Sequence, residues 1–123
     1  MDIAGKIFSK EEADNIYGLP LVSIPVSVTE FQSYIAKTTD ALMFRFEDNK
    51  IYIADKKRNV LNDAATFPAS SVFHWFSLSV INELMEKGAG DTVSIELRDK
   101  EIVSLTINSF TLEAGANCPP WCE

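Results

Sequence analysis

Both cysteines of the chain, Cys118 and Cys122, stand in its last seven residues, NCPPWCE. Two nearby thiols can form a redox couple or supply half of a zinc site. The consecutive prolines Pro119 and Pro120 favour polyproline II at about 3.1 Å per residue, which would hold the cysteines roughly 12 Å apart. A disulfide needs Cα atoms within about 7 Å, so an internal bridge requires a bend, such as a turn at Trp121. The sequence therefore predicts a stiff tail in which an internal bridge is possible but not preorganised.

Neither thiol chemistry nor metal binding is well supported by this tail. In thioredoxin-like proteins Cys-x-x-Cys opens a helix after a strand, whereas here three residues separate the cysteines at the end of the chain. Glu123 adds negative charge beside Cys122 and disfavours the thiolate that a reactive cysteine needs. Structural zinc sites use four ligands, so the two cysteines would need a second subunit, or His74 and a carboxylate. A thiol-redox or metal-binding function through Cys118 and Cys122 is therefore the alternative hypothesis, and we expect no cofactor.

His74 is the sole histidine, so any histidine-based acid–base chemistry must pass through it. It stands between Phe73 and Trp75, a setting typical of a partly buried structural histidine. The serines around it stand outside any Gly-x-Ser-x-Gly motif, and helix capping explains them better. A small-molecule enzyme using His74 is thus a minor alternative, we assign no catalytic residue, and a non-enzymatic role is favoured.

Composition excludes several partners. The 123 residues carry a formal charge of -7, which repels nucleic acid at long range. The one dense basic run, at 56–58, is typical of a solvated surface. There is no apolar run of about 18 residues, and the start MDIAGKIFSKEEADN lacks the apolar stretch of a secretory signal. We therefore expect no membrane partner and a cytoplasmic location.

Local patterns predict the elements that would position these residues. Ser9 and Glu12 form a capping box for a helix over 10–17, and Gly18 fits its end. Alternation over 21–28 predicts a strand with Pro25 at an edge or a bulge. Further signals predict a helix from about 29 to 38 capped by Thr29, a hairpin over 42–53, and a second hairpin over 93–105.

The segment 71–87 has two interpretations. It can be one continuous helix, or a strand followed by a helix that Ser77 or Ser79 caps and that stops at 88–90. The aromatic and β-branched run Val72–Phe76 suits a strand better. We favour the strand followed by a helix.

The second half of the chain repeats the plan of the first. Residues 40–48 align with 91–99 without a gap, so that apolar positions and turn aspartates coincide. Approximate repeats at 20–55 and 71–108 would each hold a strand, a helix and a hairpin. The predicted fold is a single α+β domain over 1–113, an antiparallel sheet with helices on one face, followed by a tail over 114–123.

This order of elements resembles that of sliding-clamp domains, and the resemblance extends to element order only. Clamps line a DNA channel with basic helices, whereas each helix expected in the two repeats places a lysine among glutamates. Topology alone does not carry function, so we assign no family.

Exposed aromatic residues suggest the function. In a strand over 72–76, Phe73 and Trp75 point away from His74 and Phe76, so both faces carry large groups. The strand is then either central and buried, or one face needs a partner. The leading hypothesis is a non-enzymatic protein-interaction or self-association module, a homo-oligomer or a partner of another protein. Its tentative contacts are Phe73, Trp75, Pro119, Pro120 and Trp121.

Overall fold

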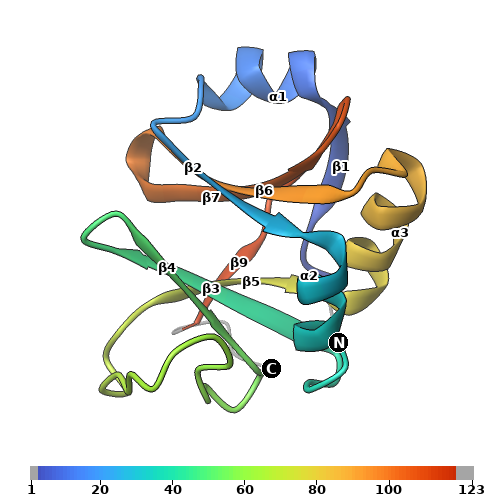
Figure 1. Ribbon diagram of the computed structural model, residues 1–123. Helices are drawn as coiled ribbons and strands as arrows, with labels where there is room; N and C mark the ends of the chain where they lie inside the picture. The colour runs from blue at the N-terminus through green and yellow to red at the C-terminus, as the bar shows by residue number, and fades with distance from the viewer. Residues whose placement is uncertain (1–2, 119–123) are drawn as a thin grey trace.

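Two antiparallel sheets and three α-helices build the computed structural model, which describes residues 3–118 (Figure 1). The first sheet has the order β1-β8-β7-β6-β2, and the second has the order β4-β3-β5-β9. The strands of the first sheet are β1 (Lys6–Ser9), β8 (Phe110–Glu113), β7 (Ile102–Ile107), β6 (Thr92–Arg98) and β2 (Val22–Ser27). Those of the second are β4 (Lys50–Ala54), β3 (Ala41–Glu47), β5 (Phe73–Ser77) and β9 (Ala116–Cys118). The helices are α1 (Lys10–Tyr17), α2 (Val28–Ile35) and α3 (Leu78–Gly88), with a 3₁₀ turn, η1, at Asp99–Glu101.

The strongest local predictions are confirmed. Helix α1 spans 10–17 with both hydrogen bonds of the Ser9–Glu12 capping box, and Gly18 at its end has a φ of 84°. Strand β2 lies at the edge of its sheet, where Pro25 removes no ladder bond from a central strand. Strand β5 followed by α3 replaces the continuous helix over 71–87, which is therefore wrong.

Two helix caps differ from the prediction. Helix α2 begins at Val28, and Ser27 caps it, with its hydroxyl accepting a hydrogen bond from the Glu30 amide at 3.1 Å. Thr29, the predicted cap, lies inside the first turn. Ser77 precedes α3 as predicted, but its hydroxyl instead accepts a hydrogen bond from the Ala4 amide at 2.9 Å. Tertiary partners therefore compete with local capping for these hydroxyls.

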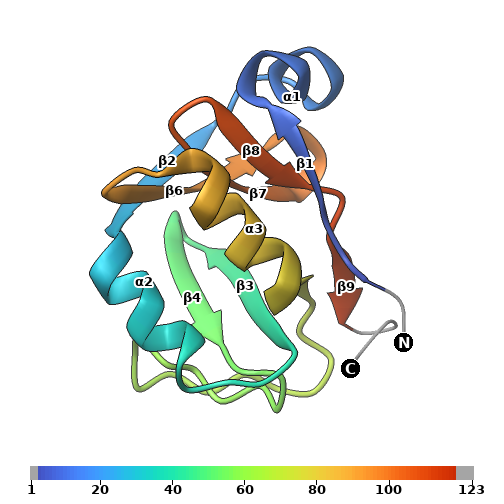
Figure 2. The same cartoon turned by 90° about the vertical axis from the view of Figure 1, so that its right-hand side faces the viewer.

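The predicted single sheet is replaced by two. Strand β2 pairs with β6 and strand β5 pairs with β3, so the first strand of each expected repeat joins the hairpin of the other. Strand, helix and hairpin do occur twice in order, while an internal duplication stays a prediction. The prediction that all helices lie on one face of the sheet is also wrong for the first sheet. Helices α2 and α3 lie together beside both sheets, whereas α1 covers the opposite, outer face of the first sheet (Figures 1 and 2).

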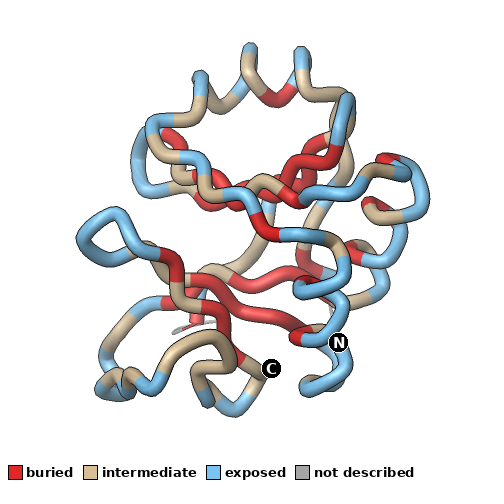
Figure 3. The backbone as a smooth tube through the Cα atoms, in the orientation of Figure 1, coloured by how far each residue is buried: buried red, intermediate tan, exposed pale blue. Residues whose placement is uncertain are grey.

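The core consists of two apolar clusters. The larger one joins both sheets to α2 and α3 and includes Phe31, Phe44 and Phe76, all fully buried. The smaller one lies on the other side of the second sheet, around Phe73 and Trp75. Figure 3 shows that buried positions are concentrated along the strands of both sheets. Strand β5 is thus buried on both faces, which explains its continuous aromatic run.

The predicted tail begins inside the fold. Residues 116–118 form β9, which pairs with β5 and places Cys118 opposite Phe73. The paired structure therefore continues past residue 113. Pro119, Pro120, Trp121 and Cys122 lie outside the described residues.

Gly115 brings the chain close enough to β5 for this pairing. A Cβ atom at Gly115 would lie 2.7 Å from the carbonyl oxygen of Trp75 and 2.8 Å from the Phe76 ring. We expect Gly115→Ala to lower the free energy of unfolding by about 1–3 kcal/mol, since overpacking against backbone forces a shift. Denaturation in urea measures the change. Ala114→Gly is the control, because Ala114 has a φ of 60° that glycine adopts freely. Equal stability of the two variants would contradict the close approach.

Candidate functional site

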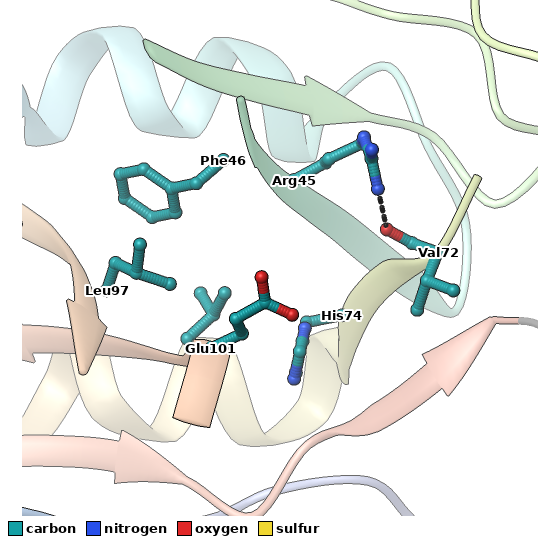
Figure 4. A pocket seen from close by; sticks show the side chains of 7 residues that line it. Arg45, Phe46, Val72, His74, Leu97 and Glu101 are labelled. Atoms are coloured by element: carbon teal, nitrogen blue, oxygen red, sulfur yellow. Dashed lines mark hydrogen bonds between the residues drawn. The ribbon is translucent and has the colours of Figure 1, made fainter. Parts of the chain in front are cut away.

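His74 lines a hollow of about 250 Å³ between β3, β5 and the β6–β7 turn. The imidazole is half-buried, and burial lowers the pKa of His74, although the carboxylate of Glu101 opposes that shift. At pH 7 the ring is therefore neutral and offers one nitrogen as a donor and the other as an acceptor. The remaining lining residues are Arg45, Phe46, Val72, Leu97, Glu101 and Val103 (Figure 4).

The turn η1 aims a carboxylate into this hollow. Lys100 and Glu101 both have a positive φ, at 62° and 60°, a backbone conformation that is uncommon for residues with a side chain. Figure 4 shows the Glu101 carboxylate beside the imidazole of His74. Two consecutive residues with positive φ are typical of a tight hairpin turn, as at Asp48 and Asn49 between β3 and β4, and here the turn directs the Glu101 side chain.

Arg45 supplies the cation of the hollow. Its Nη1 donates a hydrogen bond to the carbonyl oxygen of Val72 at 2.9 Å, and its guanidinium lies 5.6 Å from the ring centre of Phe67. Among the described residues, its buried Nε has no hydrogen-bond partner. The guanidinium is thus held from two sides, and its Nη2 lies 3.8 Å from the carboxylate of Glu47 without a hydrogen bond between them.

A second polar region lies between α1 and the outer face of the first sheet. Its centre is Arg98, which is 0% exposed. Nη1 donates to the Asp14 carboxylate at 2.8 Å, Nη2 to Glu96 at 3.0 Å, and Nε to the Ser104 hydroxyl at 2.9 Å. Nη1 also donates to the carbonyl oxygen of Gly18, at the end of α1. We call Asp14, Glu96, Arg98, Ser104, Thr106, Thr111 and Glu113 the α1 polar cluster.

Two carboxylates of the cluster differ in charge state. Burial raises the pKa of Asp14, but hydrogen bonds from Arg98 and Lys10 outweigh it and hold the pKa below its usual value. Glu113 is 0% exposed, and neither of its oxygens has a hydrogen-bond partner among the described residues. Burial raises the pKa of Glu113 to about 7, even though Arg98 lies 3.9 Å away. Asp14 is therefore ionised at neutral pH while Glu113 is close to half protonated.

An exposed aliphatic segment lies directly above Arg98. Ile16, Leu19 and Leu21 are 60%, 69% and 69% exposed, and we call residues 16–21 the aliphatic segment. Ile16 and Tyr17 line a hollow of about 400 Å³ together with Gly18, the turn residues Asp99 and Lys100, and Ile102 at the start of β7. Arg98 fixes the segment from below through the Gly18 carbonyl. The structure therefore presents three aliphatic side chains on an anchored turn.

The aromatic residues chosen from the sequence are not exposed. Phe73 is 0% and Trp75 is 6% exposed, because β5 is the central buried strand of the alternative interpretation. Neither side chain is available to a partner in this structure. The contacts predicted for Pro119, Pro120 and Trp121 concern residues outside those described.

Cys118 is buried and disulfide-bonded, so its sulfur is not a free thiol in this structure. A thiol-redox or metal-binding function through Cys118 and Cys122 stays a prediction. Nη1 of Arg58 lies 3.4 Å from the carbonyl oxygen of Cys118, and the guanidinium lies over the Phe73 ring at 4.8 Å. Arg58, from the basic run expected to be solvated, therefore holds β9 and β5 together. Cys122 lies outside the described residues.

Comparison with known proteins does not indicate a family or a function for this chain. No protein-family model, curated protein or solved structure gives a significant match to this chain. In the described part, residues 3–118, no group of three or more His, Cys, Asp or Glu side chains could hold a metal ion. Within the same residues no helix has both the length and the apolar character needed to cross a membrane.

Sequence reasoning missed both the α1 polar cluster and the aliphatic segment. The polar residues of β6, β7 and β8 alternate with core residues, a pattern typical of a solvent-facing side of a sheet. Helix α1 covers that side, and this packing leaves no local signal. For the segment a signal was present, since NIYGLPLV places three large aliphatic residues around Gly18 and Pro20 at a turn.

Proposed function

We propose that this chain is a non-enzymatic protein-interaction module that docks the aliphatic segment into a partner protein. The observation that carries the proposal is the exposure of Ile16, Leu19 and Leu21 within six residues of chain. Exposed aliphatic groups scattered singly need no explanation, whereas three within six residues, of which Ile16 lines a hollow, are typical of an interaction site.

Rigid presentation supports this role. Helix α1 is fixed by its capping box at one end and by Arg98 at the other. The rings of Phe8 and Tyr17 also meet edge to face with centres 5.8 Å apart, which ties the last turn of α1 to β1. A segment that is ordered before binding loses less conformational entropy on binding.

Charge indicates the chemistry of the partner. The first turn of α1 exposes Glu11 and Glu12, and the whole chain carries a net charge of -7. A second copy would present the same negative potential, which opposes self-association. The partner expected is therefore a protein with an apolar groove and basic side chains at its rim.

Site-specific photocrosslinking identifies such a partner. A photoreactive residue at position 19 should form a covalent adduct with a basic protein, whereas one at the exposed position 57, on the β4–β5 connection, should not. Adducts that contain only a second copy of this chain would overturn the proposed partner, as would equal yields at the two positions. Self-association and a cytoplasmic location otherwise stay predictions.

Replacement of one leucine tests the surface once the captured protein is purified. Leu19→Ser is expected to weaken its binding at least tenfold, since anchor residues contribute about 1–2 kcal/mol or more. Ile3→Ser is the matched control, because Ile3 is also 69% exposed but lies outside the segment. Titration calorimetry at low and high salt measures both, and the affinity should fall as salt screens the charges. Equal affinity of the two variants would show that the aliphatic segment is not the docking surface.

A further inference from the structure

The hollow around His74 has one apolar and one polar side. Figure 4 shows Phe46 and Leu97 on one side, Arg45 and His74 on the other, and the carboxylate of Glu101 between them. Small-molecule sites have this composition, with apolar walls and a few polar groups that fix orientation. The volume of about 250 Å³ lies below the about 300–1,000 Å³ of pockets for drug-sized ligands, so the matching ligand is small.

The charges in this hollow select the ligand class. Arg45 contributes one positive charge, which the half-exposed Glu47 carboxylate, 3.8 Å from Nη2, offsets only in part. Glu101 contributes one negative charge, and His74 is neutral at pH 7. A simple anion attracted by Arg45 would be repelled by Glu101, and a simple cation would meet the reverse. A zwitterion satisfies both groups at once, with its ammonium at Glu101 and its carboxylate at Arg45.

The polar groups are held in place by elements of the fold. His74 pairs with Phe44, the residue before Arg45 on β3, so the paired strands hold Arg45 and His74 at the same end of the sheet. The hydrogen bond from Arg45 to the Val72 carbonyl fixes the guanidinium, and the left-handed backbone of η1 fixes Glu101. Arg45 and His74 are therefore positioned by strands and Glu101 by a tight turn, which favours a site that is formed before a ligand enters.

We propose that this pocket binds a free α-amino acid with an apolar side chain. The side chain packs against Phe46 and Leu97, the carboxylate accepts hydrogen bonds from Arg45, and the ammonium donates to Glu101. The imidazole of His74 accepts a second hydrogen bond from the ammonium. This site is separate from the aliphatic segment and does not rest on the proposed protein partner.

Titration of the ¹⁵N-labelled protein, followed by NMR, tests the ligand class with leucine as the probe. Leucine should shift the amide signals around residues 45, 74 and 101 in a saturable manner below about 10 mM, because a ligand of this size gains only a few kcal/mol. Four analogues each change one group: 3-methylbutylamine, 4-methylpentanoate, glycine and leucinamide. Each should bind at least tenfold more weakly than leucine.

Variants assign the polar contacts. Glu101→Gln and Arg45→Gln should each weaken leucine binding at least tenfold, while Glu83→Gln, the same chemical change on the exposed side of α3, should leave it unchanged. Leu19→Ser should also leave it unchanged, which separates this site from the protein-docking surface. Absence of saturable shifts with leucine would overturn the proposal, and so would equal binding of 3-methylbutylamine. Leucinamide binding as tightly as leucine would instead indicate a peptide N-terminus and would also overturn it.

Discussion

Replacement of Arg98 by methionine is expected to lower the free energy of unfolding by about 3–5 kcal/mol, because it breaks a buried ion pair from one side. The guanidinium is 0% exposed and donates to Asp14, Glu96, Ser104 and the carbonyl of Gly18. Methionine fills a similar volume but donates no hydrogen bond. The buried carboxylate of Glu96 would then lose its cationic partner and keep only the hydroxyls of Ser104 and Thr106 as hydrogen-bond partners.

Urea denaturation of the two proteins measures this loss. Lys100→Met is the control, since Lys100 is exposed two residues away and its loss changes the net charge equally. A double variant that adds Glu96→Gln should recover part of the loss, because it also removes the stranded charge. A loss below about 1 kcal/mol for Arg98→Met would show that the cluster contributes no more than a surface ion pair.

The same arginine links stability to the proposed docking surface. Its hydrogen bond to the Gly18 carbonyl and its ion pair with Asp14 hold the end of α1, immediately before Leu19 and Leu21. An anchored segment keeps its aliphatic side chains in one arrangement, whereas a loosened one would have to be ordered again on binding. A loss of partner affinity in Arg98→Met would thus follow from the position of the segment, without any direct contact between Arg98 and the partner.

Local chemistry explains what could be predicted from the sequence. The Ser9–Glu12 capping box, Gly18 and the alternation over 21–28 act over a few residues. The first two took the expected form, and the third formed β2 at 22–27, with Val28 instead beginning α2. The strand at 73–77 was recognised by its aromatic run, and its burial on both faces was one of two interpretations. These features can be predicted without knowing which elements pack together.

Long-range packing explains what could not be predicted. The exchange of β2 and β5 between the two hairpins splits one expected sheet into two, and no residue marks it. The position of α1 turns Glu96, Arg98 and Glu113 from apparent surface residues into a buried cluster. Ser27 and Ser77 show the same effect on a smaller scale, because the choice between a local cap and a distant amide depends on tertiary contacts.

Glu113 gives the chain an unusual dependence of stability on pH. Its pKa is 4.5 without perturbation and about 7 in the folded protein, where burial disfavours the charged form. Between these values the folded state binds more protons than the unfolded state, so the free energy of unfolding falls as pH rises. The loss approaches about 1.36 kcal/mol per pH unit and amounts to about 3 kcal/mol between pH 4.5 and pH 7. Below pH 4.5 this contribution is fully present, and above pH 7 it is lost.

Neighbouring groups set the conditions of the test. Arg98 and Glu96 face Glu113 from β6, Asp14 from α1, and Lys6 pairs with it on β1, with its ammonium 5.3 Å from the Phe8 ring centre. Asp14 has a lowered pKa, so its own contribution is lost only as the solution becomes more acidic than its usual pKa of 3.8. His74, with a lowered pKa, has the opposite slope to Glu113, because its unfolded state binds more protons.

Glu113→Gln isolates the Glu113 contribution, because glutamine resembles the protonated carboxyl and does not ionise. The difference in free energy of unfolding between this variant and the unchanged chain cancels the Asp14 and His74 contributions. We expect the two proteins to be about equally stable at pH 4, and the variant to be more stable by about 3 kcal/mol at pH 8. Glu11→Gln, on the exposed side of α1, should follow the unchanged chain at both pH values. A Glu113→Gln variant that is less stable at pH 8 would show that the ionised carboxylate is stabilised by Arg98, and that the α1 polar cluster is a fully paired network at neutral pH.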